Sequence, residues 1–202
     1  MRIILFFVFF CGAVGLAQQP PHVPSAEQQI AAAVLPLPES MRAGAGVRGY
    51  DHDLKPVMLR QTSNSMVCTG QRPGNQIFDV RCYHESFLPV VDRMRDFFRK
   101  GGKPEAIFST IDSEIKTGKL KLPPQPTAGY RMEGPISAYD QKTNTAGKEI
   151  KSWQSVHFPY RTAAEIGLPD ERDHIGSMPY VMTSGTFWSH VMIVHEPTPA
   201  SQ

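Results

Sequence analysis

The pattern of apolar and polar residues changes along this chain, and each change predicts a different kind of structure. Residues 3–14 form an uninterrupted apolar run. From Gly46 to His84, apolar and polar residues alternate in short stretches separated by turn-forming residues, which predicts strands. The expected strands are 47–50, 56–60, 65–69 and 76–83. Their short, regular spacing is typical of an antiparallel meander.

The next stretch has helical spacing and predicts a hairpin of two helices. Apolar residues recur at intervals of three and four from Phe87 to Phe98, with Ser86 as the expected N-cap. A second helix is expected from Pro104, since proline is favoured in a first turn, to Gly118, since glycine favours a helix end. Its expected buried residues are Ile107, Phe108, Ile111 and Ile115.

The remaining elements are shorter. Ser25 and Gln28 form a capping box that opens an Ala-rich helix, and Thr162 with Glu165 forms a second box for a single helical turn. Further strands are expected at 129–133, 152–158, 180–183 and 190–195. No repeat or linker divides the chain. We therefore predict one α+β domain over residues 25–195, with a mainly antiparallel sheet and the central helical hairpin packed on one face.

The N-terminal apolar run has the layout of a secretory signal peptide. Arg2 gives a short positive region, the run 3–14 follows, and Gly15-Leu16-Ala17 places small residues at the −3 and −1 positions of a signal peptidase site. We expect cleavage after Ala17, and an uncleaved anchor is the alternative. Because the run is shorter than the roughly 20 apolar residues that span a bilayer, no membrane span is expected after cleavage.

Secretion would place the mature protein in the periplasm or at the cell exterior. The chain then divides into a signal peptide (1–17), a flexible N-terminal segment (18–24), the folded domain (25–195) and a disordered tail (196–202). The full chain of 202 residues has a formal net charge of +2. Since nucleic acids and anionic membranes attract clustered basic residues, this near-neutral charge excludes them as main partners.

Two cysteines remain once Cys11 is removed with the signal. In an oxidising compartment Cys68 and Cys82 are expected to form a disulfide. Both share a strand face with apolar residues, so both can enter one apolar layer. The turn between them leaves two registers open. Opposing the cysteines centres the hairpin near Asn75, whereas a tight turn at residues 72–75 shifts the register by about two residues.

Most motifs associated with catalysis are absent. The sequence has no H-E-x-x-H, C-x-x-C, G-x-S-x-G or phosphate-binding Gly-Lys loop. Residues 44–49 match G-x-G-x-x-G, but a dinucleotide site needs this string between a strand and a helix, and here a turn precedes it. We therefore expect no cofactor. Asp51-His52-Asp53 and the segment 170–174 are interpreted as loops, because aspartate is favoured in turns.

Two places could still carry chemistry. His84 and Glu85 stand where a strand meets the main helix, beside a helix N-terminus that can hold an anion. His190 begins an apolar strand after a hydroxyl-rich turn that includes Ser184 and Ser189. A helix cap and a hydrogen-bonded structural histidine are the simpler interpretations. If the two histidines met, they could bind a metal or act as a general base for a serine.

The same residues carry a resemblance. Cys82-Tyr83-His84 before a helix, the late stretch Pro179-Tyr180-Val181-Met182, and Gly185-Thr186 followed by His190-Val191-Met192-Ile193 resemble a group of uncharacterised exported bacterial proteins. The resemblance covers residues 28–194. It implies bacterial export and no particular chemistry, since no activity is assigned to the group.

These observations favour a non-enzymatic exported domain that acts as a monomer and binds an unknown protein or small molecule. The alternative is a hydrolase or metal-dependent enzyme centred on His190, with His84, Glu85 or Ser184 as partners and with zinc as its metal. The two hypotheses differ in one structural expectation. An enzyme needs His190 beside a second polar side chain and open to a pocket, whereas a structural histidine is enclosed.

Overall fold

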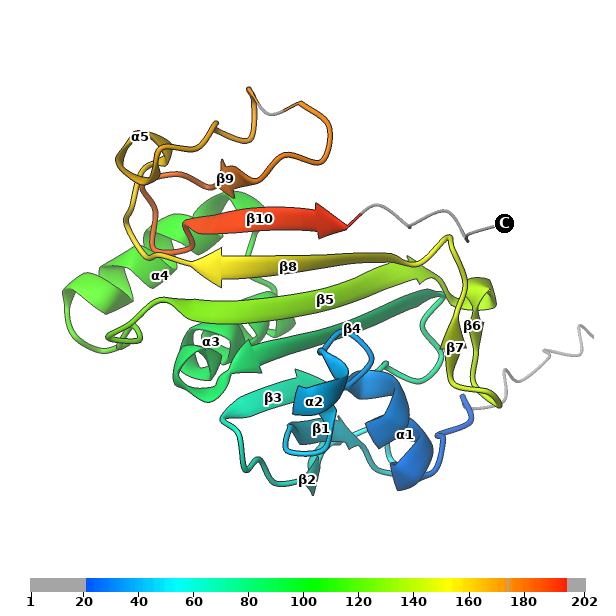
Figure 1. The fold of residues 1–202 in the computed structure, drawn as a ribbon. Helices are drawn as coiled ribbons and strands as arrows, with labels where there is room; N and C mark the ends of the chain where they lie inside the picture. The colour runs from blue at the N-terminus through cyan, green and yellow to red at the C-terminus, as the bar shows by residue number, and fades with distance from the viewer. Residues whose placement is uncertain (1–20, 174, 196–202) are drawn as a thin grey trace, which may run out of the picture.

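A computed structural model describes residues 21–173 and 175–195. The predicted signal peptide and C-terminal tail lie outside these residues. The structure confirms the predicted fold class: one α+β domain with an eight-stranded, mostly antiparallel sheet and two packed helices, α3 (Leu88–Arg99) and α4 (Ile107–Lys116) (Figure 1). Across the described ranges, none of the helices is long and apolar enough to cross a bilayer.

The sheet has the strand order β2-β1-β3-β4-β5-β8-β10-β9. Its strands are β1 (Gly46–Tyr50), β2 (Pro56–Arg60), β3 (Met66–Thr69), β4 (Ile77–His84), β5 (Thr127–Pro135), β8 (Lys151–His157), β9 (Tyr180–Met182) and β10 (His190–His195). All neighbouring pairs are antiparallel except β1 with β3. The long strands β4, β5 and β8 lie at its centre.

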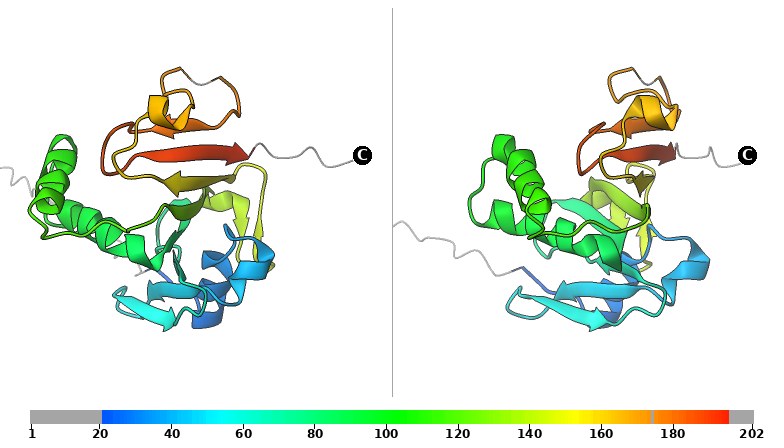
Figure 2. Two further views of the ribbon diagram at one scale, coloured as in Figure 1. Left: turned by 60° about the vertical axis from the view of Figure 1, so that its left-hand side comes forward. Right: turned by 90° about the vertical axis from the view of Figure 1, so that its left-hand side faces the viewer.

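The helical hairpin packs on one face of this sheet. Phe87, Val90 and Ile111 are fully buried between the helices and the strands, as the helical spacing predicted. Arg93 of α3 donates to both carboxylate oxygens of Glu114 in α4, at 2.7 Å each, which fixes the two helices together. In Figure 2 these helices (green) lie on one side of the sheet and the N-terminal helix (blue) on the other.

That N-terminal helix is α1 (Ala26–Ala33), followed by the short α2 (Glu39–Arg42). The predicted capping box is present: the Ser25 hydroxyl accepts the amide of Gln28, and the Gln28 side chain accepts the amide of Ser25. Gln29 is 5% exposed, and its amide bonds the backbone of Tyr50 in both directions, at 2.8 and 2.9 Å. This buried side chain therefore ties α1 to β1.

The predicted meander is wrong at one strand. β3 pairs with β1 and runs parallel to it, rather than antiparallel to β2. The connection 61–65 crosses over the start of β1, and a Cβ on Gly46 would come within 3.0 Å of the Thr62 backbone nitrogen. Glycine permits this close approach. On Gly49, a Cβ would come within 2.3 Å of Leu59, so glycines of the G-x-G-x-x-G string serve local packing.

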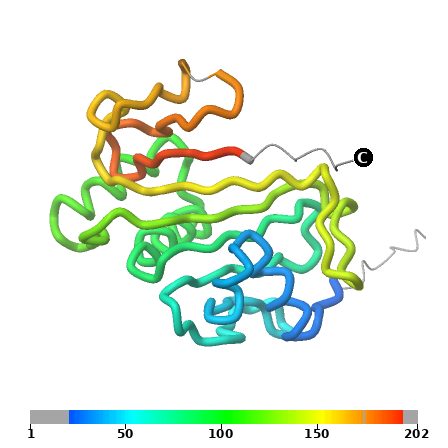
Figure 3. Tube along the Cα trace, in the orientation of Figure 1, coloured from blue at the N-terminus to red at the C-terminus, as the bar shows by residue number. Residues whose placement is uncertain are grey.

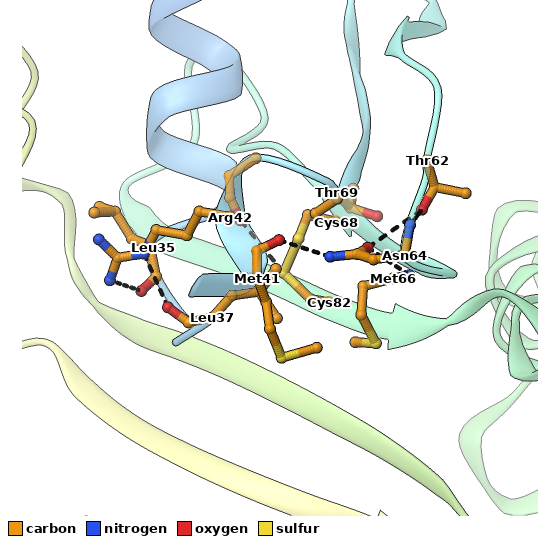
Figure 4. The surroundings of a disulfide bond; sticks show 12 residues. Leu35, Leu37, Met41, Arg42, Thr62, Asn64, Met66, Cys68, Thr69 and Cys82 are labelled. Carbon is orange, nitrogen blue, oxygen red and sulfur yellow. Dashed lines mark hydrogen bonds between the residues drawn. A yellow bond between two sulfur atoms is a disulfide. The ribbon is translucent and has the colours of Figure 1, made fainter. Parts of the chain in front are cut away.

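The predicted disulfide between Cys68 and Cys82 is present. The two cysteines lie directly opposite each other on β3 and β4 and are fully buried. Figure 4 shows the bond in the apolar layer under α1 and α2, next to Met66 and Leu37. Both cysteines therefore enter one core, as their strand faces indicated.

Of the two registers that the sequence left open, the structure has the one that opposes the cysteines, together with the tight turn that was expected to shift it. A tight turn forms at residues 72–75, where the Asn75 amide donates to the Arg72 carbonyl, and the cysteines are nevertheless opposed. Gln71 accounts for the difference. Its side chain accepts the Asp79 amide at 2.7 Å and donates to the Ile77 carbonyl at 2.8 Å, which fills the gap between the ladder and the turn.

Several small elements complete the chain. The sequence did not predict the hairpin of β6 (Tyr139–Asp140) and β7 (Thr145–Ala146), which packs through Tyr139 on Phe78. The predicted box of Thr162 and Glu165 opens α5 (Ala163–Ile166). Short 3-10 turns are η1 (Glu85–Phe87), η2 (Pro104–Ala106) and η3 (Ile136–Ala138). The trace in Figure 3 shows the segment between β8 and β9 folding back beside β9 at one edge of the sheet.

Candidate functional site

His84 has a structural contact at the end of β4. Its Nδ1 lies 2.8 Å from the Ser86 hydroxyl and accepts the Ser86 amide at 3.3 Å, so the imidazole caps η1. The prediction of Ser86 as the N-cap of the main helix is therefore wrong, because α3 has Phe87 at that position and no side-chain cap. Glu85 is exposed in the first turn of η1, where a negative charge suits the helix dipole.

The hydroxyls of the turn that precedes β10 hold the chain in place. Ser184 Oγ accepts the amide of Ala163 at 2.8 Å and so fixes the start of α5. Ser189 Oγ donates to the Arg161 carbonyl at 2.6 Å. Thr186 Oγ1 donates to the Thr183 carbonyl within the turn at 2.7 Å. The turn is thus a rigid, internally bonded unit attached to the segment 161–163.

His190 does not meet His84. The two lie on strands three places apart in the sheet, which separates them by about 14 Å. His190 is 5% exposed, and its Nδ1 lies 2.7 Å from the Trp188 carbonyl. The side chain next to it is His157, directly opposite on β8, and the two rings stack with their centroids 4.8 Å apart.

The histidine pair lies in an aromatic part of the core. His157 is 2% exposed and contacts the rings of Phe87, Trp188 and Tyr83. Its Nε2 is 3.3 Å from the Ser155 hydroxyl, whereas its Nδ1 is buried with no hydrogen-bond partner among the described residues. Burial holds the pKa of His157 well below its usual value, and protonation of His190 would lower it further.

Burial also lowers the pKa of His190, although its bond to the Trp188 carbonyl acts in the opposite direction. Both imidazoles are therefore neutral at neutral pH. Neither lines the surface hollows described below. The pair is enclosed, so it has the surroundings of structural histidines rather than those of a catalytic base open to a substrate.

Sequence reasoning did not single out His157. It stands in a predicted strand, two residues after Ser155, and this spacing places both side chains on one face. The register that opposes it to His190 depends on pairing between β8 and β10, which are 33 residues apart at these positions and joined through α5 and β9. The alternation of Ser155 and His157 along the strand is the sequence feature that could have indicated a polar pair on this face.

A surface groove adjoins the same turn on its outer side. One hollow of about 440 Å³ lies between α4 and the turn, and a second of about 340 Å³ adjoins it; both are lined by Phe108 and Thr186. We call the first hollow the α4 groove. Its residues are Phe108, Ser109, Asp112, Lys116, Tyr160, Gly185, Thr186 and Phe187.

Tyr160 has an unusual backbone conformation in the α4 groove. Its φ is 64°, a left-handed conformation that is costly for a bulky residue. Two bonds hold it there: its amide donates to the Thr186 carbonyl at 2.7 Å, and its phenol donates to Asp112 at 2.7 Å. Thr183, which lines the adjoining hollow, also has a positive φ, of 51°. Two of the five described non-glycine residues with positive φ therefore lie beside the groove, and the other three, Leu54, Ser65 and Asn144, lie elsewhere.

The charged groups of the α4 groove form a short chain. Lys116 pairs with Asp112 at 2.6 Å, and the same carboxylate accepts the Tyr160 phenol. The hydrogen bond from Lys116 lowers the pKa of Asp112, and the bond from Tyr160 lowers it further. Burial and the bond to Asp112 raise the pKa of Tyr160 to about 12. The phenol is therefore a hydrogen-bond donor at physiological pH and not a base.

The acidic turn 51–53 has ligand atoms close together but is organised as a turn. Ligand atoms of Asp51, His52 and Asp53 lie within 4.8 Å of one another. Asp51 Oδ1 already accepts the amides of Asp53 and Lys55, at 2.9 Å each. This is the turn role that the sequence indicated, and it gives no support for a metal.

A comparison of the chain with protein-family models, with curated proteins and with solved structures finds no match. The resemblance to exported bacterial proteins therefore stays an expectation.

Proposed function

We propose that the protein is an exported, monomeric, non-catalytic binding domain of the periplasm or cell exterior, and that its ligand site is the α4 groove. The predicted signal peptide, cut after Ala17, and the disulfide between Cys68 and Cys82 support export, since disulfides persist in oxidising compartments. The main support for this site is the strained conformation of Tyr160, which two hydrogen bonds hold beside the groove.

Strain of this kind supports a binding role for a physical reason. A left-handed bulky residue costs of order 1–3 kcal/mol and persists where surrounding contacts determine it. Here those contacts come from both walls of the groove, Asp112 on α4 and Thr186 in the turn. The shape of the groove is thus set before a ligand arrives, which lowers the cost of binding.

The groove suits a small organic molecule with an apolar body and an anionic end. Phe108 supplies an apolar surface and packs on the buried Phe187, with ring centroids 5.4 Å apart. Lys116 is exposed at the rim and is paired with a single carboxylate. An anionic group on a ligand would accept a hydrogen bond from Lys116, which otherwise pairs with Asp112, while the aromatic side chain buries the apolar part of the ligand.

The enzyme hypothesis has less support. Of its predicted residues, His190 is enclosed, His84 caps η1, and Ser184 fixes α5. A general base has to reach the proton that it removes. A zinc site would need several of these side chains together, and they are held in separate places.

The proposal can be tested with anilinonaphthalene sulfonate, a probe with an aromatic body and an anionic group. Proton–nitrogen correlation spectra should show shifts at the amides of Ser109, Gly185 and Thr186, and Phe108→Ala should weaken binding about tenfold by removing one wall. Phe98→Ala is the matched control, because Phe98 is an exposed phenylalanine on α3. Shifts confined to other surfaces, or equal binding by both variants, would overturn the proposal.

A further inference from the structure

A row of arginines crosses the sheet at a distance from the α4 groove. Arg48, Thr69, Arg81, Arg131 and Trp153 occupy successive opposed positions on β1, β3, β4, β5 and β8. Opposed residues project from the same face of a sheet. This is the face that carries α3, so the row and the helix lie next to each other.

Two of these arginines are directly opposed, which is unfavourable for like charges. Asp79 lies between them: it accepts bonds from Arg81 at 2.8 and 2.5 Å and from Arg131 at 3.0 and 3.2 Å. Burial acts to raise the pKa of Asp79, but the two guanidiniums outweigh it and the pKa is lowered. One carboxylate thus serves two guanidiniums.

Arg131 is held in place from several sides. It pairs with Glu133, and its guanidinium lies 5.0 Å from the ring centre of Trp153. Its side chain is 25% exposed, so it is partly desolvated and still reachable from solvent. Burial lowers the pKa of Arg131, and the charge of Arg81 lowers it further.

Helix α3 adds a fourth guanidinium. Arg48 pairs with Asp92 of α3 at 2.7 Å. Arg95, one turn later, donates to the Thr69 hydroxyl at 3.2 Å from both terminal nitrogens. In the part of the chain that the structure describes, no carboxylate pairs with Arg95. Thr69 is opposed to Arg81, so Arg95 bonds the strand position next to Arg81.

We propose that Arg81, Arg95 and Arg131 form a binding site for an oxyanion, specifically the phosphate group of a small molecule. Guanidiniums are planar forks that bond phosphate oxygens two at a time. Here they come from two layers, the sheet and α3, which suits a tetrahedral group better than a planar carboxylate. The bound phosphate neutralises the charge of Arg95. Its oxygens accept hydrogen bonds from Arg81 and Arg131, which otherwise share the carboxylate of Asp79. This site is separate from the α4 groove and does not depend on it.

The test is a titration of the purified mature protein with inorganic phosphate at constant ionic strength, followed by NMR of the arginine side-chain N–H groups and the Trp153 indole. Shifts are expected at Arg81, Arg95, Arg131 and Trp153, with weaker binding of acetate. Glycerol phosphate distinguishes the source: tighter binding than inorganic phosphate assigns an ester, and equal binding assigns the free ion.

Two variants give opposite expected effects. Arg95→Gln keeps a donor for Thr69 but removes the charge, and it should weaken phosphate binding about tenfold. Glu133→Gln frees Arg131 from a competing carboxylate and should tighten binding several-fold. Arg99→Gln and Glu105→Gln are the matched controls, because they change the net charge equally at exposed positions outside the row.

The controls separate a built site from general attraction. Binding should be unchanged in Arg99→Gln and Glu105→Gln, and their spectra should show the same perturbed arginines as the parent protein. The proposal is overturned if phosphate leaves the signals of Arg81, Arg95 and Arg131 unmoved, or if the two control variants shift affinity as much as Arg95→Gln and Glu133→Gln do.

Discussion

His157 and His190 lie opposite each other on β8 and β10, with their rings stacked at 4.8 Å and both side chains almost fully buried. Two bases that are neutral in the folded state become cations when the chain unfolds in acid. The pair therefore makes the stability of the fold depend on pH, whatever ligand the protein binds.

The first prediction is a loss of stability in mild acid. Because burial lowers both histidine pKa values below 6.5 in the folded protein, the unfolded chain binds more protons below that pH. The free energy of unfolding should be steady above about pH 7 with respect to these groups and should fall below about pH 6.5, by up to about 1.4 kcal/mol per pH unit for each histidine. Urea unfolding at a series of pH values measures it.

Variants identify the groups responsible. His157→Phe replaces the imidazole by a ring that does not titrate, so the slope below pH 6.5 should decrease. His52→Gln is the control, because the His52 side chain is 88% exposed. The pH dependence of the His157→Phe variant gives the contribution of the carboxylates, which is subtracted from that of the parent protein. If the remaining free energy of unfolding stays constant or rises from pH 7 to 5, the histidine pair is not responsible for the loss of stability.

The second prediction concerns the disulfide. Removing the bond between Cys68 and Cys82, by the double change to alanine, should lower the free energy of unfolding by about 2–4 kcal/mol, since the unfolded chain gains freedom and the buried sulfurs are lost. Thermal unfolding of both proteins with and without reductant measures it. The parent should shift with reductant and the variant should not. Two alkylatable thiols in the unreduced mature protein would contradict the bond itself.

Local signals in the sequence predicted the longer helices and several of their ends, but not the start of α3, where Phe87 rather than Ser86 is the N-cap. The boxes at Ser25 and Thr162 form, and Gly118 ends the second helix with a positive φ. These features depend on residues within one or two turns of each other. The parallel pairing of β3 with β1 was missed because it depends on the close approach of the connection 61–65 to Gly46, a tertiary contact.

The candidate site was less accessible to sequence reasoning. The turn 183–189 was identified by its hydroxyls, and the groove does form beside it, but its other wall comes from α4 and from Tyr160. Nothing in the sequence around Tyr160 indicates a left-handed backbone. The arginine row was missed because Arg48, Arg81 and Arg131 come onto one line across the sheet only through the strand order.

The third prediction tests the packing role of a glycine in the G-x-G-x-x-G string. Gly49→Ala should destabilise the fold by about 1–3 kcal/mol, because the added Cβ would lie 2.3 Å from Leu59 and 2.5 Å from the Gln29 side chain. Gly70→Ala is the control: its Cβ would meet nothing closer than 3.4 Å. Chemical denaturation compares the two. Equal stability of both variants would show that Gly49 is not needed for this contact.

The fourth prediction concerns the phenol in the α4 groove. Burial and its bond to Asp112 raise the pKa of Tyr160 to about 12. Asp112→Asn removes the negative charge that opposes ionisation of the phenol, so the pKa of Tyr160 should fall. Carbon NMR of the tyrosine rings against pH measures this shift, and Tyr160→Phe assigns the signal by its disappearance. Asp96→Asn, on α3, removes a carboxylate elsewhere and should leave the titration of Tyr160 unchanged. If Asp112→Asn titrates like the parent protein, the hydrogen bond does not hold the phenol, and the argument that Tyr160 is fixed from both walls of the groove fails with it.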